Sequence, residues 1–149
     1  MNKQTRNIIN VSLTLVAIYL YSFTASNIET EILGFNSFKF LISIAVLIQF
    51  LIFLPSFIFK TEKFYDLTGS LTYIAVTSIA YFSVDNPTTT DTILYLYVII
   101  WAGRLGLFLF RRINKDGKDE RFDKAKKKFF WFLQYWMGQA AWVVFTAGA

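Results

Sequence analysis

The amino-acid sequence predicts an all-α fold, a polytopic transmembrane helix bundle with about five spans. Of the 149 residues, 55% are hydrophobic and only 17% are charged, whereas a soluble domain usually carries about 25% charged residues. The charges also cluster between long apolar stretches, a pattern typical of proteins that cross a membrane several times. The length is that of one domain, so residues 1–149 are expected to form a single transmembrane domain.

Five apolar segments are expected to cross the membrane as helices. A straight span of a ~30 Å hydrocarbon core needs about 20 residues. The second and fifth segments reach this length, the first and fourth are borderline, and the third is short, which is acceptable where neighbouring helices shield its ends. The expected spans are residues 8–25, 40–59, 67–82, 93–110 and 129–147.

The distribution of lysine and arginine predicts the orientation. Basic residues gather in 1–7, 60–66 and 111–128, whereas 83–92 contains none and only Lys39 lies beside the remaining loop. Basic loops favour the cytoplasmic side. The N-terminus is therefore expected in the cytoplasm, and the protein in a multi-pass integral membrane location, which in a bacterium is the inner, or plasma, membrane.

The composition also excludes several kinds of chemistry. The chain has no cysteine and no histidine, so it lacks thiolate ligands, a cysteine nucleophile and the usual zinc or haem ligands. We expect no metal site. The net charge of +5 is attributed to the cytoplasmic loops rather than to a nucleic-acid partner.

An arginine inside the fourth apolar segment is the first candidate for a functional group. Ionisable side chains within a span are costly and often mark functional sites. Tyr97, Trp101, Arg104, Phe108 and Arg111 recur at steps of three and four, so they share one helix face. This face is expected to point to a pocket inside the bundle; the alternative is that the arginine snorkels toward the cytoplasmic interface.

The third apolar segment offers a plausible opposite wall. Asp66, Ser70, Tyr73, Thr77 and Tyr81 also share one helix face. The aspartate lies near the helix N-terminus, where a carboxylate is favoured. It is either a functional group or a helix cap, and Tyr73 is either a proton donor or a packing residue.

Small and amide side chains are expected at helix contacts. Gly69, Gly103 and Gly106 would allow either close helix approach, which is the favoured interpretation, or access of a ligand to the backbone. Gln134 and Gln139 need hydrogen-bond partners in lipid and are therefore expected to face other helices.

The charged segment 111–128 holds nine basic and four acidic residues. Attraction to anionic lipid, about 1 kcal/mol per basic residue near the surface, accounts for the lysines of 124–128. It does not account for the acidic residues of 116–123. These predict an ordered element with specific ion pairs, in which one or two cations could bind a phosphate-bearing ligand.

Three stretches resemble a known family. KFYDLTGSLTYI (63–74), WAGRLGLFLFRRINKDGKDERFD (101–123) and FFWFLQ (129–134) are similar to the DUF1295 family. This membrane family is related to the steroid 5-alpha-reductases and, more distantly, to sterol reductases and isoprenylcysteine methyltransferases. The resemblance covers roughly residues 40–145.

The resemblance implies an NADPH-dependent reductase of an activated carbon–carbon double bond in a lipid or steroid-like substrate. Asp66 and Tyr73 would be the catalytic residues near the substrate. The residues implied near the cofactor are Arg104, Arg111, Lys118, Asp119 and Arg121.

Family members are considerably longer than this chain, so the chain is expected to be an incomplete, N-terminal part of such a domain. It would then be inactive alone or require a partner equivalent to the C-terminal half. The other expected partners are membrane lipids. The alternative is a small, non-enzymatic membrane protein with a structural or lipid-interacting role.

Overall fold

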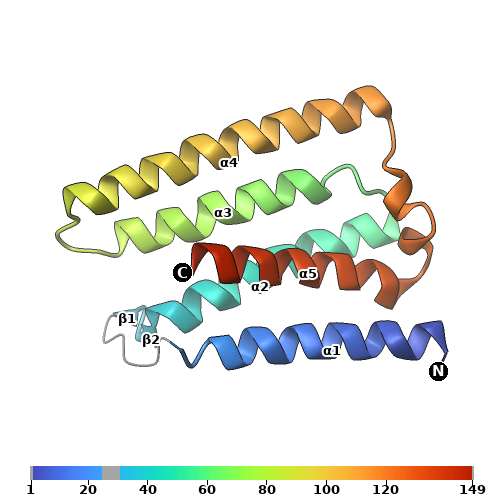
Figure 1. Ribbon diagram of the computed structural model, residues 1–149, viewed down its shortest axis with the longest axis horizontal. Coiled ribbons are helices and arrows are strands. Elements are labelled where there is room, and N and C mark those ends of the chain that lie inside the picture. The colour runs from blue at the N-terminus through green and yellow to red at the C-terminus, as the bar shows by residue number, and fades with distance from the viewer. Residues whose placement is uncertain (1, 25–30, 149) are drawn as a thin grey trace.

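The computed structural model describes residues 2–24 and 31–148, and within these ranges the fold is mainly helical (Figure 1). Two short strands form a hairpin, and two 3-10 helices lie between the last two α-helices. In chain order the elements are α1 (Lys3–Tyr21), β1 (Glu31–Ile32), β2 (Phe35–Asn36), α2 (Ser37–Ile58), α3 (Tyr65–Phe82), α4 (Thr89–Asp116), η1 (Glu120–Phe122), η2 (Ala125–Lys127) and α5 (Phe129–Ala147).

Each of the five predicted apolar segments overlaps one α-helix. The first helix ends earlier than predicted, because α1 stops at Tyr21 and residues 22–24 form a turn, and residue 25 lies outside the described residues. The prediction of an all-α fold is therefore confirmed in its main feature. By length and composition, α2 and α4 are long and apolar enough to cross a membrane. This weakly suggests a membrane protein.

Helix α4 is longer than the apolar segment that predicted it. At its start, Thr88 and Asp91 form a capping box, in which the Thr88 backbone N–H donates to Asp91 Oδ2 at 2.8 Å. At its end, Gly117 adopts a left-handed φ of 77°, which favours glycine and stops the helix. The helix has 28 residues, about 42 Å at 1.5 Å per residue. The segment 111–116 is thus helical and not part of the loop.

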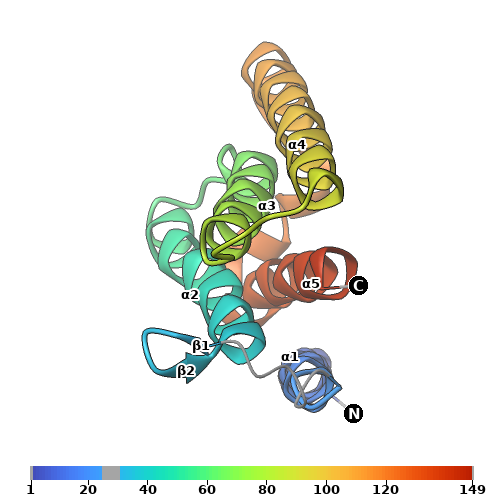
Figure 2. The ribbon, with the colours of Figure 1, turned by 90° about the vertical axis from the view of Figure 1, so that its left-hand side faces the viewer.

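Helix α5 occupies the centre of the bundle and packs against α1, α2 and α3 (Figure 2). Helix α4 lies at the outside and packs mainly on α3. The core divides into two clusters. One, near the C-terminal end of α5, is built largely from small aliphatic residues such as Ala45, Ala140 and Val143. The other, near the start of α5, is aromatic and includes Phe53, Phe132 and Trp136.

The expected contact between the third and fourth apolar segments is confirmed. A Cβ on Gly106 would lie 2.7 Å from Ser70 Cβ, and one on Gly69 would lie 2.5 Å from Gln139 Nε2, so both glycines permit close packing. Gly103 has open space where its Cβ would be, so its predicted role in packing is wrong.

The β1–β2 hairpin was not predicted from the sequence. Glu31 pairs with Asn36 and Ile32 with Phe35. Leu33 and Gly34 both have positive φ, 54° and 78°, as a two-residue hairpin turn of type I′ requires. Strands of two residues are too short to show an alternating pattern, which explains why the sequence did not reveal them.

Candidate functional site

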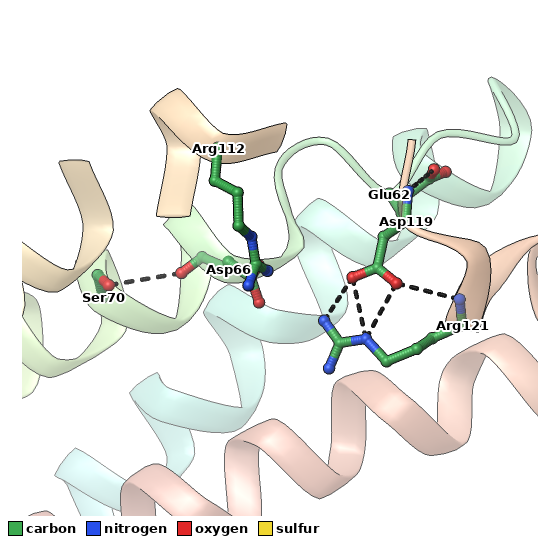
Figure 3. A network of polar contacts seen from close by, with 6 residues as sticks. All are labelled: Glu62, Asp66, Ser70, Arg112, Asp119 and Arg121. Carbon is green, nitrogen blue, oxygen red and sulfur yellow. Dashed lines mark hydrogen bonds and ion pairs between the residues drawn. The ribbon is translucent and has the colours of Figure 1, made fainter. Parts of the chain in front are cut away.

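Two ion pairs lie where α3 begins and α4 ends (Figure 3). Arg112 Nη2 donates to Asp66 Oδ2 at 3.3 Å. The Arg121 guanidinium donates to Asp119 Oδ2 through Nε at 2.9 Å and through Nη2 at 2.5 Å. Asp119 Oδ1 also accepts from the Arg121 backbone N–H at 3.0 Å and so caps η1. The first pair joins the YDLTGS segment to α4, the second lies within the GKDERF segment, and the Tyr65 and Phe122 rings bring the two segments together.

A buried glutamate connects the same loop to the turn between α2 and α3. The Glu62 side chain is only 4% exposed. Its Oε1 accepts from the Asp119 backbone N–H at 3.0 Å, and its Oε2 accepts from Lys126 Nζ at 2.7 Å. Burial alone would lower the pKa of Lys126, but the hydrogen bonds to Glu62 and Asp123 outweigh it and raise that pKa. Lys126 is therefore held in its charged form.

An aromatic anchor holds the loop against the helices. Phe122 is 1% exposed, and its ring lies 4.8 Å from that of Tyr65 and 4.9 Å from that of Tyr135. The Tyr65 hydroxyl donates to the Tyr135 carbonyl at 3.0 Å. Burial raises the pKa of Tyr65 above its ordinary value, so this hydroxyl keeps its proton. The segment after α4 is thus an ordered element, as its acidic residues predicted.

The residues of the two ion pairs, Asp66 with Arg112 and Asp119 with Arg121, line an open cavity of about 530 Å³, which we call the mixed cavity. Its charged lining comprises four carboxylates and three cations. Each cation forms an ion pair with a described carboxylate. The charged lining residues are Asp66, Asp116, Asp119, Glu120, Arg112, Lys118 and Arg121.

The pKa values of Asp66 and Asp119 are shifted in opposite directions. Burial raises the pKa of Asp66 above its ordinary value, although Arg121 and Arg112 partly offset this. Hydrogen bonds from Arg121 lower the pKa of Asp119. Neighbouring titratable groups whose pKa values are driven apart are typical of acid–base sites, although structural ion-pair networks produce the same pattern.

Tyr73 lies in a different place from Asp66. It is 8% exposed, its hydroxyl bonds to that of Thr146, and its ring meets Trp101 edge-on at 5.1 Å. It lines an apolar groove of about 730 Å³ between α3, α4 and the end of α5, together with Trp142. Asp66 and Tyr73 therefore line two separate cavities. The seven residues between them correspond to about 10 Å along the helix.

Most of the Arg104 face does not point into the bundle as predicted, although Trp101 on that face meets Tyr73 and lines the apolar groove. Tyr97 is 69% exposed and Phe108 is 63% exposed, and Arg104 is exposed as well. Arg104 forms no ion pair with a described residue. It is two residues before Gly106, a rotation of about 200° around a helix, so it points away from the α3 contact.

Arg111 is likewise exposed, and Arg112 takes the place in the cluster that was expected for it. Of the predicted site residues, the structure therefore brings together four: Asp66, Lys118, Asp119 and Arg121. It does not bring Tyr73, Arg104 or Arg111 to the mixed cavity.

Sequence reasoning missed Glu62, Arg112, Phe122 and Lys126. One signal could have located Arg112: the small residues Ala102 and Gly106 mark the face of α4 that meets α3, and only residues near that face can reach Asp66. No local pattern identified Glu62, because its partners come from a distant part of the chain.

A family model matches residues 52–149, and its description reads "Protein of unknown function (DUF1295)". The chain belongs to the DUF1295 family. The match includes the mixed cavity, the apolar groove and α5, and it leaves α1 outside. No curated protein and no solved structure matches this DUF1295 chain.

Proposed function

We propose that this protein is a multi-pass membrane protein that contributes part of an NADPH-dependent reductase acting on a conjugated double bond of a lipid or steroid-like substrate. The proposal places all five apolar helices across the membrane, with the N-terminus in the cytoplasm. A partner that supplies the rest of the reductase fold would cover the exposed face of α4.

The observation that carries the proposal is the mixed cavity, which collects both kinds of charge that a dinucleotide needs. Lys118 and Arg121 could contact phosphates, and the Asp119 carboxylate could accept from ribose hydroxyls. NADPH would supply a hydride. To release Arg121 for a phosphate, its ion pair with Asp119 would have to open.

In this proposal the substrate binds in the apolar groove. The groove is large enough for a small apolar molecule. The Tyr73 hydroxyl donates to Thr146, because the Thr146 hydroxyl donates to the Trp142 carbonyl, so Tyr73 could donate to a substrate only by leaving that partner. Asp66 is assigned to the cofactor side, because it lines the mixed cavity.

A specific observation favours the alternative, a non-enzymatic membrane protein. Every cation that lines the mixed cavity already has a carboxylate partner in the described residues, so the cluster could hold the loop in place without binding any ligand. The two functions are separated by measuring cofactor binding.

NADPH binding by the purified chain in detergent, followed by nicotinamide fluorescence, tests the reductase proposal. Arg121→Gln should weaken binding about tenfold, the effect of losing one charge-assisted hydrogen bond, whereas the exposed Lys124→Gln should not. The same titration is repeated with a co-expressed C-terminal half of a longer DUF1295 protein. If neither preparation binds NADPH, the result contradicts the reductase proposal and favours the alternative.

The membrane topology has a direct test, because the chain contains no cysteine. Single Lys63→Cys, Asp85→Cys and Lys124→Cys variants can be labelled in intact cells with a membrane-impermeant maleimide. Only Asp85→Cys should react before permeabilisation. Labelling of Lys63→Cys in intact cells would contradict the proposed orientation.

A further inference from the structure

A second cavity at the same end of the bundle collects basic residues from two distant segments. It has a volume of about 690 Å³ and lies between the first turns of α1 and α5, and we call it the basic cavity. Lys3, Arg6 and Lys128 line it, and none of the described residues in its lining is acidic. None of these three cations forms an ion pair with a described carboxylate.

The side chain of Asn7 lines the same cavity. Asn7 is 9% exposed, and its side chain forms no hydrogen bond with a described residue. Its amide atoms are not fully enclosed, because the enclosed side-chain atoms without a partner in the described residues belong to Gln49, Trp136 and Gln139, so the amide is open to the cavity. A ligand in the basic cavity could accept a hydrogen bond from this amide.

The backbone at this end of the molecule also favours an anion. Helices α1 and α5 both begin at this end of the molecule (Figure 1). Asn2 caps α1, whereas no side chain caps α5, and the first-turn residues Phe129, Phe130 and Trp131 line the basic cavity. Helix N-termini carry partial positive charge and free N–H groups, and they favour anions.

We propose that the basic cavity binds the phosphate group of an anionic phospholipid. Cations without carboxylate partners and a free amide suit a phosphate group. Trp131 beside them is of the kind found at the membrane interface, which favours a lipid headgroup as the source of that phosphate. The inference shares with the proposed function only the membrane location, and it does not depend on reductase activity.

Isothermal titration of the full chain in a neutral detergent tests this proposal with three probes: short-chain phosphatidylglycerol, short-chain phosphatidylcholine and inorganic phosphate. Phosphatidylglycerol should bind at least about tenfold more tightly than phosphatidylcholine, whose choline offsets the phosphate charge. Inorganic phosphate at high concentration should compete with phosphatidylglycerol.

Two variants probe the cavity itself. Arg6→Gln removes an exposed cation, and Asn7→Asp is nearly isosteric but places a carboxylate against the phosphate. Each should weaken phosphatidylglycerol binding about tenfold, as expected for one charge-assisted hydrogen bond. Lys124→Gln and Lys127→Gln, exposed lysines outside this lining, are the matched controls. Each should weaken binding clearly less than the cavity variants do, by no more than the general attraction of a surface cation for anionic lipid.

Three results would overturn the proposal. Equal binding of the two lipids would show that charge is not recognised. Equal losses in the control variants would show that surface potential, and not the cavity, attracts the lipid. Binding of inorganic phosphate without phosphatidylglycerol would exclude a lipid as the source. Circular dichroism of Arg6→Gln and Asn7→Asp identifies an unfolded variant, and failure of NADPH binding changes none of these expectations.

Discussion

The mixed cavity and the basic cavity lie at the same end of the bundle and both collect basic side chains, but they differ in what accompanies those side chains. In the mixed cavity, Arg112, Lys118 and Arg121 each meet a carboxylate. In the basic cavity, Lys3, Arg6 and Lys128 have no described ion-pair partner.

The difference indicates two uses of the same residue types. A cation with a carboxylate partner fixes one segment of the chain against another, and an added anion must compete with that partner. A cation without such a partner gains an ion pair only when an anion binds. We therefore expect substitutions at the mixed cavity to change stability and substitutions at the basic cavity to change binding.

The largest expected loss of stability is at Phe122, the aromatic anchor of the loop that carries Asp119 and Arg121. Phe122→Ala should lower the free energy of unfolding by about 4 kcal/mol, because it leaves a hole beside Tyr65 and Tyr135. Thermal unfolding by circular dichroism measures the loss, and tryptic cleavage within 124–128 should become faster. Phe108→Ala, at a residue 63% exposed, is the control. Unchanged protease resistance of the loop would contradict the anchoring role.

The next effect is at the buried glutamate. Glu62→Ala leaves Lys126 and the Asp119 N–H without their partner and should cost about 3 kcal/mol, since removal of one member of a buried ion pair is costly. Adding Lys126→Met should restore part of the loss in the same unfolding assay. If the double variant loses as much free energy of unfolding as the sum of the losses of Glu62→Ala and Lys126→Met alone, the two side chains are not coupled.

The pH dependence separates two of the carboxyls that line the mixed cavity, Asp119 and Asp66. The folded pKa of Asp119 is lowered, so its contribution to stability is present above the unfolded value of about 3.9 and is lost as the pH falls through the folded pKa. The folded pKa of Asp66 is raised, so its contribution is present below the unfolded value and is lost as the pH rises through the folded pKa.

Melting temperatures measured from about pH 2.5 to pH 7 test these signs. Asp119→Asn should reduce the acid-side loss, and Asp66→Asn should reduce the loss on the higher-pH side. The wild-type curve is the reference for both variants. Identical curves for wild type and Asp119→Asn would show that the pair with Arg121 does not contribute.

The smallest effect distinguishes two adjacent arginines. Arg112→Gln should cost up to about 1 kcal/mol, because its side chain is 43% exposed and solvent weakens its pair with Asp66. Arg111→Gln should change the free energy of unfolding by less than about 0.5 kcal/mol, since Arg111 is exposed and has no described ion pair. A larger loss for Arg111→Gln than for Arg112→Gln would contradict the assignment of the ion pair.

The sequence by itself determined the positions of the five α-helices, because each required a long apolar segment and the charges lay between those segments. It also determined that the acidic residues of 116–123 belong to an ordered element, since lipid attraction does not explain them. The contact of α3 with α4 was expected from the polar face of α3, which includes Ser70, but the α4 residue that meets Ser70 is Gly106 and not Arg104.

Only the tertiary structure decided which cations have partners. The choice between Arg111 and Arg112 depends on a rotation of about 100° around α4, set by how Gly106 packs on Ser70. Arg104 was misplaced because helical periodicity groups residues on a face without saying whether that face is covered. The basic cavity was not foreseen, because Asn7 and Lys128 come together only when α1 packs along α5.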